Sequence, residues 1–168
     1  MTVLIAAETP DQTDVLELIA ELDAYQHALY PAESNHLLDL NSLLQPNVLF
    51  VVARDGERRA IGCGAIVLYS QYGEIKRMYV RPSGRGQGVA KAMLAALEAD
   101  AAQRGCTTLC LETGIHQPEA IALYERSGYR RCGPFGDYRD DPLSIFMRKS
   151  ANTWIGVELI ARPPSLKE

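Results

Sequence analysis

The feature that most constrains this 168-residue chain is a glycine-rich turn between a strand pattern and a helix pattern. Residues 74–80 are typical of a β-strand, and the turn that follows holds Gly84, Gly86 and Gly88. Apolar residues then recur at helical spacing over residues 88–104. The first N–H groups of a helix have no partner within it, and the helix dipole attracts anions to that end. Because glycine allows an anion to approach the backbone closely, the turn is predicted to bind a phosphate.

The charge pattern around this turn supports a small anionic ligand. The chain has a net charge of −4, which argues against a nucleic-acid partner. Residues 75–97 nevertheless contain no Asp or Glu, so this segment is locally cationic. Its positive charges are Lys76, Arg77, Arg81, Arg85 and Lys91.

Two well-known phosphate-binding motifs do not fit the turn. A Walker A loop requires GxxxxGK followed by Ser or Thr, which is absent from this segment. A dinucleotide fingerprint requires GxGxxG, but its sixth position is Lys91 counting from Gly86 and Val89 counting from Gly84. Glu112 does end the next predicted strand, where a dinucleotide fold places its ribose-binding acid, so that alternative stays open.

The remaining pattern predicts an α+β fold with the element order βααβββαβαββ. A largely antiparallel sheet is expected, with one strand–helix–strand crossover between residues 74 and 112. The hairpin between the second and third strands is indicated by Asp55-Gly56. The expected strands are 2–7, 48–54, 60–70, 74–80, 107–112, 129–132 and 144–149, and the expected helices are 11–29, 33–45, 88–104 and 118–127.

The expected organisation is a single domain over residues 1–150 followed by a C-terminal extension of unknown role at 151–168. The start of the chain has no basic region, and its apolar run is too short for a signal peptide. No apolar run reaches the roughly 20 residues that a membrane span requires. A cytoplasmic protein without a membrane partner is therefore expected.

Three segments in order resemble the GNAT superfamily of N-acetyltransferases. Arg85-x-x-Gly88-x-Ala90 is similar to the pyrophosphate loop of that family. Residues 74–82 resemble its fourth strand, and residues 120–129 resemble its A-x-x-L-Y-x-x-x-G-F/Y segment. The resemblance extends over residues 48–149, and on it the chain is identified as a member of the superfamily.

The resemblance implies a splayed sheet that admits acetyl-coenzyme A, the cosubstrate, between the fourth and fifth strands. Main-chain groups near Met78 and Val80 would pair with the pantetheine arm, and amides of residues 86–91 would hold the pyrophosphate. Gln117 departs from the family pattern, which often has Asn seven residues before the tyrosine. The implied coenzyme-binding residues are Met78, Tyr79, Val80, Arg85, Gly86, Gln87, Gly88, Val89, Ala90, Lys91 and Gln117.

Acetyl transfer to an amine requires a neutral amine, a stabilised oxyanion and a proton for the departing thiolate. The thioester is already activated, so neither a metal nor a protein nucleophile is needed. Tyr124 is the candidate acid, because a phenol with a pKa of about 10 stays protonated at neutral pH. Glu74 is the candidate base, with Glu112 and His116 as rivals. The oxyanion donor is expected to be a backbone N–H on the fourth strand, near residues 78–79.

The loop at residues 135–141 is expected to contact the acceptor, because loops often determine specificity. Asp137 and Tyr138 are its predicted substrate-binding residues, and Asp141 could also attract a cationic amine. The predicted reaction is direct attack by a primary amine of a small or amino-acid-like metabolite, in a ternary complex. A protein or peptide amine, and an acyl-CoA-binding domain without catalysis, are the alternatives. The resemblance also allows a homodimer, since dimers are common in the family.

Overall fold

The computed structural model describes residues 2–35 and 38–150, so the predicted extension at 151–168 lies outside the described residues. Seven strands form one sheet in the order β1-β2-β3-β4-β5-β7-β6. The paired strands are antiparallel, except that β4 and β5 are parallel. This is the mixed, mostly antiparallel sheet predicted. The strands are β1 Leu4–Ala7, β2 Val48–Arg54, β3 Ala60–Leu68, β4 Gly73–Val80, β5 Thr108–Gly114, β6 Arg130–Cys132 and β7 Ser144–Ser150.

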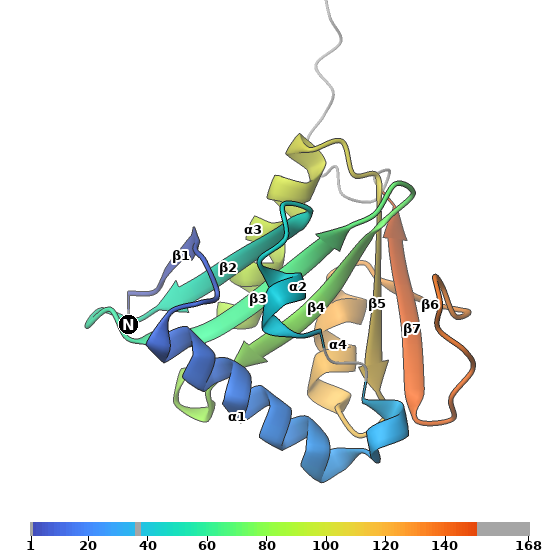
Figure 1. The fold of residues 1–168 in the computed structure, drawn as a ribbon, viewed down its shortest axis with the longest axis horizontal. Coiled ribbons are helices and arrows are strands. Elements are labelled where there is room, and N and C mark those ends of the chain that lie inside the picture. Colours follow the sequence, from blue (N-terminus) through green and yellow to red (C-terminus); the bar gives the residue numbers. More distant parts are fainter. Residues whose placement is uncertain (1, 36–37, 151–168) are drawn as a thin grey trace, which may run out of the picture.

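Helices cover both faces of the sheet (Figure 1). The helices α1 (Thr13–Leu29) and α2 (Leu40–Leu43) lie on one face, and α3 (Val89–Gln103) and α4 (Pro118–Arg126) lie on the other. Each face has its own cluster of buried apolar side chains. The predicted α+β architecture, with helices flanking the sheet, is confirmed.

The prediction of a helix over residues 33–45 is wrong. A short 3₁₀ turn, η1 (Ala32–Ser34), and the single turn of α2 occupy this part of the chain. Polar side chains here bond the backbone locally: Asn35 Nδ2 donates to the Tyr30 carbonyl, and Asp39 accepts from the Ser42 N–H. Such bonds compete with helix formation and favour turns and caps. The other predicted elements agree with the structure within two residues at each end.

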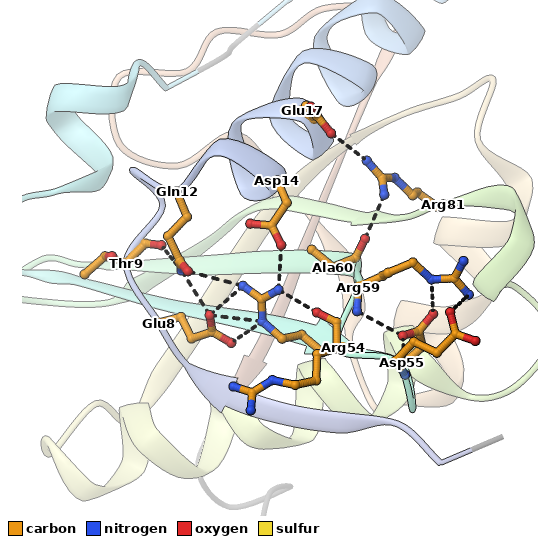
Figure 2. Close-up of polar contacts among 12 residues, drawn as sticks. Glu8, Thr9, Gln12, Asp14, Glu17, Arg54, Asp55, Arg59, Ala60 and Arg81 are labelled. Atoms are coloured by element: carbon orange, nitrogen blue, oxygen red, sulfur yellow. Dashed lines mark hydrogen bonds and ion pairs between the residues drawn. The ribbon is translucent and has the colours of Figure 1, made fainter.

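An ion cluster holds the first turn of α1 against the sheet (Figure 2). Arg54, at the end of β2, lies 2.8 Å from a Glu8 oxygen and 2.6 Å from an Asp14 oxygen. Glu8 follows β1 and Asp14 belongs to the first turn of α1. The end of β1, the start of α1 and the end of β2 are therefore fixed to one another. From this anchor α1 runs across the sheet toward β5 (Figure 1).

The strands β4 and β5 separate part-way along their length. They pair only at Gly73 with Leu109, Glu74 with Cys110, and Ile75 with Leu111. Beyond these pairs the two strands diverge (Figure 1). Among the described strands, the second half of β4 therefore has β3 as its neighbour on one side and none on the other.

A β-bulge interrupts β4 where the strands separate. Lys76 pairs with Ala65 and Tyr79 with Cys63, so Arg77 and Met78 both lie opposite Gly64. Arg77 has a φ of 59°, in the left-handed region that non-glycine residues seldom adopt. A Cβ at position 64 would overlap the Met78 sulfur, so the Met78 side chain packs here against the glycine backbone. The bulge brings Lys76 and Arg77 into the wall of one pocket.

Candidate active site

A groove of about 610 Å³ lies between the open edge of β4, the turn before α3, and α4. Three cations line it: Arg85 and Lys91 on the α3 side, and Arg126 at the end of α4. This charge suits a phosphate-bearing ligand. The groove gathers the predicted coenzyme residues except Gln87: Met78, Tyr79, Val80, Arg85, Gly86, Gly88, Val89, Ala90, Lys91 and Gln117.

The turn before α3 has the backbone that a phosphate site requires. Gly86 and Gly88 have φ values of 77° and 75°, and a Cβ added at either would meet no atom within 4 Å. Glycine is thus required here by conformation and not by crowding. Gly88 is the N-cap of α3, and the first helical bond runs from the Ala92 N–H to the Gly88 carbonyl. The N–H groups of residues 89–91 therefore have no acceptor within the helix, and they fit a pyrophosphate at the groove.

Side chains of the same turn fix its position. Arg85 Nε donates to the Val80 carbonyl at 2.9 Å, and its guanidinium lies 5.9 Å from the centre of the Tyr79 ring. Gln87 Nε2 donates to the Ser83 carbonyl at 3.5 Å. The Val80 carbonyl, which was expected to pair with pantetheine, thus accepts a hydrogen bond from Arg85. Gln87 instead contacts the preceding 3₁₀ turn, η2 (Pro82–Gly84).

A smaller pocket of about 100 Å³ opens beside the groove, on the side of α1 and β5. Four residues line both cavities: Met78, Gln117, Ala120 and Tyr124. The two cavities therefore meet at Tyr124, and a thioester in the groove would face an acceptor in the pocket. The remaining lining residues are Leu22, Gln26, Tyr30, Ser34, Glu74, Ile75, Lys76, Arg77, Glu112, Thr113, Gly114, Tyr138 and Leu143.

Tyr124 is held in α4 at the junction of the cavities. Its side chain is buried, and its ring packs edge-to-face on Tyr129 at 5.8 Å between centroids. Burial raises the pKa of Tyr124 well above its usual value, and the negative charge of Glu112 adds to the effect. The phenol is therefore fully protonated at neutral pH and can act as a proton donor.

Glu74 lies in the pocket wall as part of a polar triad. Its Oε2 accepts a hydrogen bond of 2.5 Å from the Tyr138 hydroxyl and lies 3.4 Å from Lys76 Nζ. Lys76 Nζ also donates to the Tyr138 hydroxyl at 3.1 Å. Burial raises the pKa of Tyr138, and the Glu74 charge raises it further. Two donors therefore hold this buried carboxylate in a fixed orientation in the pocket wall.

The two rival bases differ in position. Glu112, near the end of β5, lines the same pocket as Glu74. Burial raises the pKa of Glu112, while the charge of Lys76 opposes this shift. His116 lies outside the described lining of both cavities and stacks on Tyr30 with 5.6 Å between ring centroids. The pocket therefore brings together two carboxylates and leaves the histidine outside.

Tyr30 joins the end of α1 to the loop after β5. Its hydroxyl donates to Gln117 Oε1 at 3.2 Å and accepts from the His116 N–H at 3.1 Å. Gly114 permits this contact, because a Cβ there would overlap the Tyr30 hydroxyl. The side-chain oxygen of Gln117 thus accepts a hydrogen bond from Tyr30, just beyond α1. The sequence alone does not predict this contact.

The loop containing Asp137 and Tyr138 forms an outer recess of about 520 Å³ beside the pocket. Tyr138 and Lys76 line both spaces, whereas Asp137 lines only the outer one. Ser34 Oγ donates to Asp141 at 2.6 Å and so connects η1 to this loop. The recess carries more acidic than basic side chains, which favours approach by a cationic amine. Its lining is Glu33, Lys76, Asp137, Tyr138, Arg139, Asp140 and Asp141.

Some lining residues were not identified from the sequence. Tyr30 comes from a helical segment with no motif, and only folding brings it to Gln117. Arg126 could have been found, because it lies two residues after Tyr124 in the segment that resembles the GNAT pattern. Lys76 and Arg77 were noted only as positive charges.

Comparisons with known proteins agree with this architecture. The sequence profile of the Acetyltransferase (GNAT) family matches residues 14–129. The "IAA acetyltransferase" of Azospirillum brasilense is 49% identical over 149 residues, which cover 88% of this chain and 97% of that protein. A crystal structure from Klebsiella pneumoniae, provisionally named an acyl-CoA N-acyltransferase, is 44% identical with a TM-score of 0.76, over 89% of this chain and 98% of that one.

A structure of the PaiA N-acetyltransferase from Thermoplasma acidophilum, in complex with coenzyme A, has the same fold. Its TM-score is 0.72 at 19% identity, over 89% of this chain and 99% of that one. No described helix has the length and apolar character needed to cross a membrane. The family profile and the strongly similar Azospirillum and Klebsiella proteins show that the chain belongs to the acetyltransferase (GNAT) family and is an acetyl-CoA-dependent acyltransferase.

Proposed function

We propose that this protein transfers the acetyl group of acetyl-CoA directly to a primary amine of a small metabolite, within a ternary complex. The observation that carries the proposal is the meeting of a cationic groove and a carboxylate-lined pocket at Tyr124. A thioester and an amine that enter from these two sides come together beside a protonated phenol. Such positioning supplies much of the rate acceleration in a two-substrate reaction.

A group of this protein can be assigned to each step of the acetyl transfer. Glu74 takes the proton of the incoming ammonium, directly or through water, and leaves a neutral amine that attacks the thioester carbonyl. Backbone N–H groups near Met78 on the open edge of β4 stabilise the tetrahedral oxyanion. The C–N bond forms, the C–S bond breaks, and Tyr124 donates its proton to the departing thiolate. The nitrogen then gives up its second proton, which returns to the Tyr124 phenolate and leaves a neutral amide. Glu112, whose pKa is raised by burial, is the second candidate for the base.

The size of the pocket favours a small acceptor. Its cavity is about 100 Å³ and is bordered by α1, η1 and the loop before β7, whereas a peptide would need a longer, open groove. The name of the Azospirillum relative gives IAA as its acceptor, so that compound belongs in any acceptor screen. The Thermoplasma protein of the same fold was crystallised with coenzyme A, which agrees with acetyl-CoA as the donor.

The test is a screen of acceptors with the wild-type protein. Purified protein is mixed with acetyl-CoA and a panel of small amines, IAA and peptides, and free thiol release and the acetylated product are measured together. Acceptor-dependent release of thiol with formation of an N-acetylated small amine supports the proposal. Turnover of peptides alone would replace the small acceptor by a protein substrate. Tight binding of acetyl-CoA without transfer to any acceptor would indicate a binding domain.

A further inference from the structure

Arg77 is a buried arginine in the wall of the acceptor pocket. Its side chain is 3% exposed, and its Nη2 lies 2.6 Å from an oxygen of Asp23 on α1. Its Nε and Nη1 atoms are buried and have no hydrogen-bond partner among the described residues. A buried donor without a partner is destabilising, and more so when it is charged. The guanidinium therefore favours any ligand that brings an acceptor to these atoms.

A second arginine also links the β4 region to α1, and all three of its guanidinium nitrogens have a partner. Arg81, four residues further along the chain, also joins the β4 region to α1. Its Nε donates to Glu21, its Nη1 to the Ala60 carbonyl, and its Nη2 lies 3.1 Å from Glu21 (Figure 2 shows the Ala60 contact). Arg81 lines neither the groove nor the pocket. An arginine can therefore hold α1 to the sheet without leaving guanidinium nitrogens unpaired. Arg77, which has unpaired nitrogens, is the one of the two that lines the pocket.

The other charged groups of the pocket are arranged differently. Lys76 is paired with Glu74 and Tyr138, so its charge is largely compensated within the pocket wall. Glu74 and Glu112 favour the ammonium end of an acceptor. Arg77 lines the pocket and not the groove, and its guanidinium contacts Asp23 on the α1 side. The pocket therefore offers carboxylates for a cation and a guanidinium for an anion.

We propose that Arg77 binds a compact anionic group, a carboxylate or a phosphonate, on the acceptor amine. This inference rests on the proposed function and narrows its substrate class to amines that carry such a group. The amine faces Glu74 and Tyr124, while the anion accepts charge-assisted hydrogen bonds from the guanidinium. Arginine suits this role because its planar guanidinium stays charged and matches the geometry of both anions.

The test compares amines of matched length with and without the anion: propylamine, β-alanine and 2-aminoethylphosphonate. The wild-type protein should acetylate at least one anionic amine with a kcat/KM about tenfold or more above that of propylamine. Arg77→Met should remove this preference, mainly through a higher KM for the anionic amines, so that their kcat/KM falls at least about tenfold more than that of propylamine. The two anionic amines distinguish a carboxylate site from a phosphonate site.

Controls separate recognition from folding. Arg81→Met removes a comparable contact between the β4 region and α1 and should keep the preference for anionic amines. Arg77→Lys retains a charge and should recover part of the preference, and it replaces Arg77→Met if that variant does not fold. Coenzyme A affinity, measured by calorimetry, should be the same in all variants. Equal losses for propylamine and the anionic amines, or no preference in the wild-type protein, would overturn the inference.

A binding measurement keeps the inference testable if none of these amines is acetylated. Calorimetry with the coenzyme A complex should then show β-alanine or 2-aminoethylphosphonate binding to the wild-type protein and at least about tenfold weaker binding to Arg77→Met. That result would contradict the proposed reaction while supporting the anion site. Absence of binding by both compounds would reject the anion site, whatever reaction the protein performs.

Discussion

At the residue scale, the proposed mechanism uses one hydroxyl group of Tyr124. Replacement of Tyr124 by Phe keeps the ring that packs on Tyr129 and removes the proton that this mechanism gives to the leaving thiolate. Tyr124→Phe should therefore lower kcat by about tenfold or more, since general acid catalysis contributes factors of this order or larger. Coenzyme A affinity, measured by calorimetry, should change little. An unchanged kcat would exclude Tyr124 from the mechanism.

Glu112 gives a prediction about stability and pH. Burial raises its pKa in the folded protein above the ordinary 4.5, so its ionised form is less favourable in the folded state than in the unfolded state. The folded protein loses stability on this account as the pH rises from about 4.5 through the raised pKa. Glu112→Gln removes this loss, so the variant should be more stable than the wild type at pH 7.

The difference in unfolding free energy between these two proteins, measured with urea, should shrink toward pH 4, where Glu112 is protonated in both states. Glu112→Ala serves as a control that also removes side-chain packing. If Glu112→Gln is less stable than the wild type at pH 7, the ionised carboxylate has a stabilising partner, and the predicted direction of the stability change is wrong.

The same variant helps to identify the catalytic base. If Glu74 is the base, Glu74→Gln should lose far more activity than Glu112→Gln.

Contacts between site residues could be predicted from the sequence only where those residues are close together along the chain. The residues of the predicted phosphate-binding turn lie close together in the sequence, so their spacing alone was enough to predict the turn. The contact of Glu74 with Tyr138 spans 64 residues, and no local pattern reports it. Both residues were predicted for the site, but the hydrogen bond between them, and the ammonium of Lys76 beside it, emerged only from the fold.

At the element scale, the turn before α3 depends on glycine conformation. Gly88 has a φ of 75°, where a Cβ costs roughly 1–2 kcal/mol. Gly88→Ala should lower the unfolding free energy by about this amount and weaken coenzyme A binding, because the amides at the start of α3 shift. Urea unfolding and calorimetry measure the two effects.

The matched control is Gly56→Ala in the hairpin between β2 and β3. A Cβ at position 56 also meets no atom within 4 Å, but this glycine lacks a positive φ. Its substitution should leave both stability and coenzyme binding nearly unchanged. Coenzyme affinity equal to wild type in Gly88→Ala would argue against a phosphate at this turn.

Elements with a clear period were predictable, and irregular ones were not. The strands β2 to β4 and the helices α3 and α4 follow alternation, apolar stripes and glycine stops that act locally. The segment 33–45 has apolar residues at helical spacing, but its Asp, Asn and Ser side chains favour turns over a helix. The bulge at Arg77 leaves no trace in the pattern of β4, because it is a feature of the pairing with β3, where Arg77 and Met78 both lie opposite Gly64.

At the scale of the whole molecule, α1 connects two distant regions. Its first turn is held at Arg54, and its C-terminal half supplies Leu22, Gln26 and, just beyond the helix, Tyr30 to the acceptor side of the site. The order of elements was sufficient to predict a mixed sheet with helices on it. The divergence of β4 and β5 was implied only by family resemblance, because no residue pattern states where two parallel strands stop pairing.

The Arg54 cluster should make global stability depend on acid pH. Hydrogen bonds from Arg54 hold the pKa values of Glu8 and Asp14 below their ordinary 4.5 and 3.8. This stabilisation is present above those ordinary values and is lost as the pH falls through the lowered ones. Arg54→Met should therefore cost about 1 kcal/mol or less at pH 7, because the pairs are partly exposed to solvent, and progressively less below pH 4.

Urea unfolding of wild type and Arg54→Met from pH 7 to pH 2.5 measures this difference directly. Glu8→Gln is the matched variant, since it removes one carboxylate and should reproduce only part of the pH dependence. Coenzyme A affinity at pH 7 should be the same in all three proteins, because the cluster lines neither cavity of the site. A stability gap that stays constant over this pH range would mean that Arg54 contributes through packing, and that the ionised carboxylates do not hold α1 against the sheet.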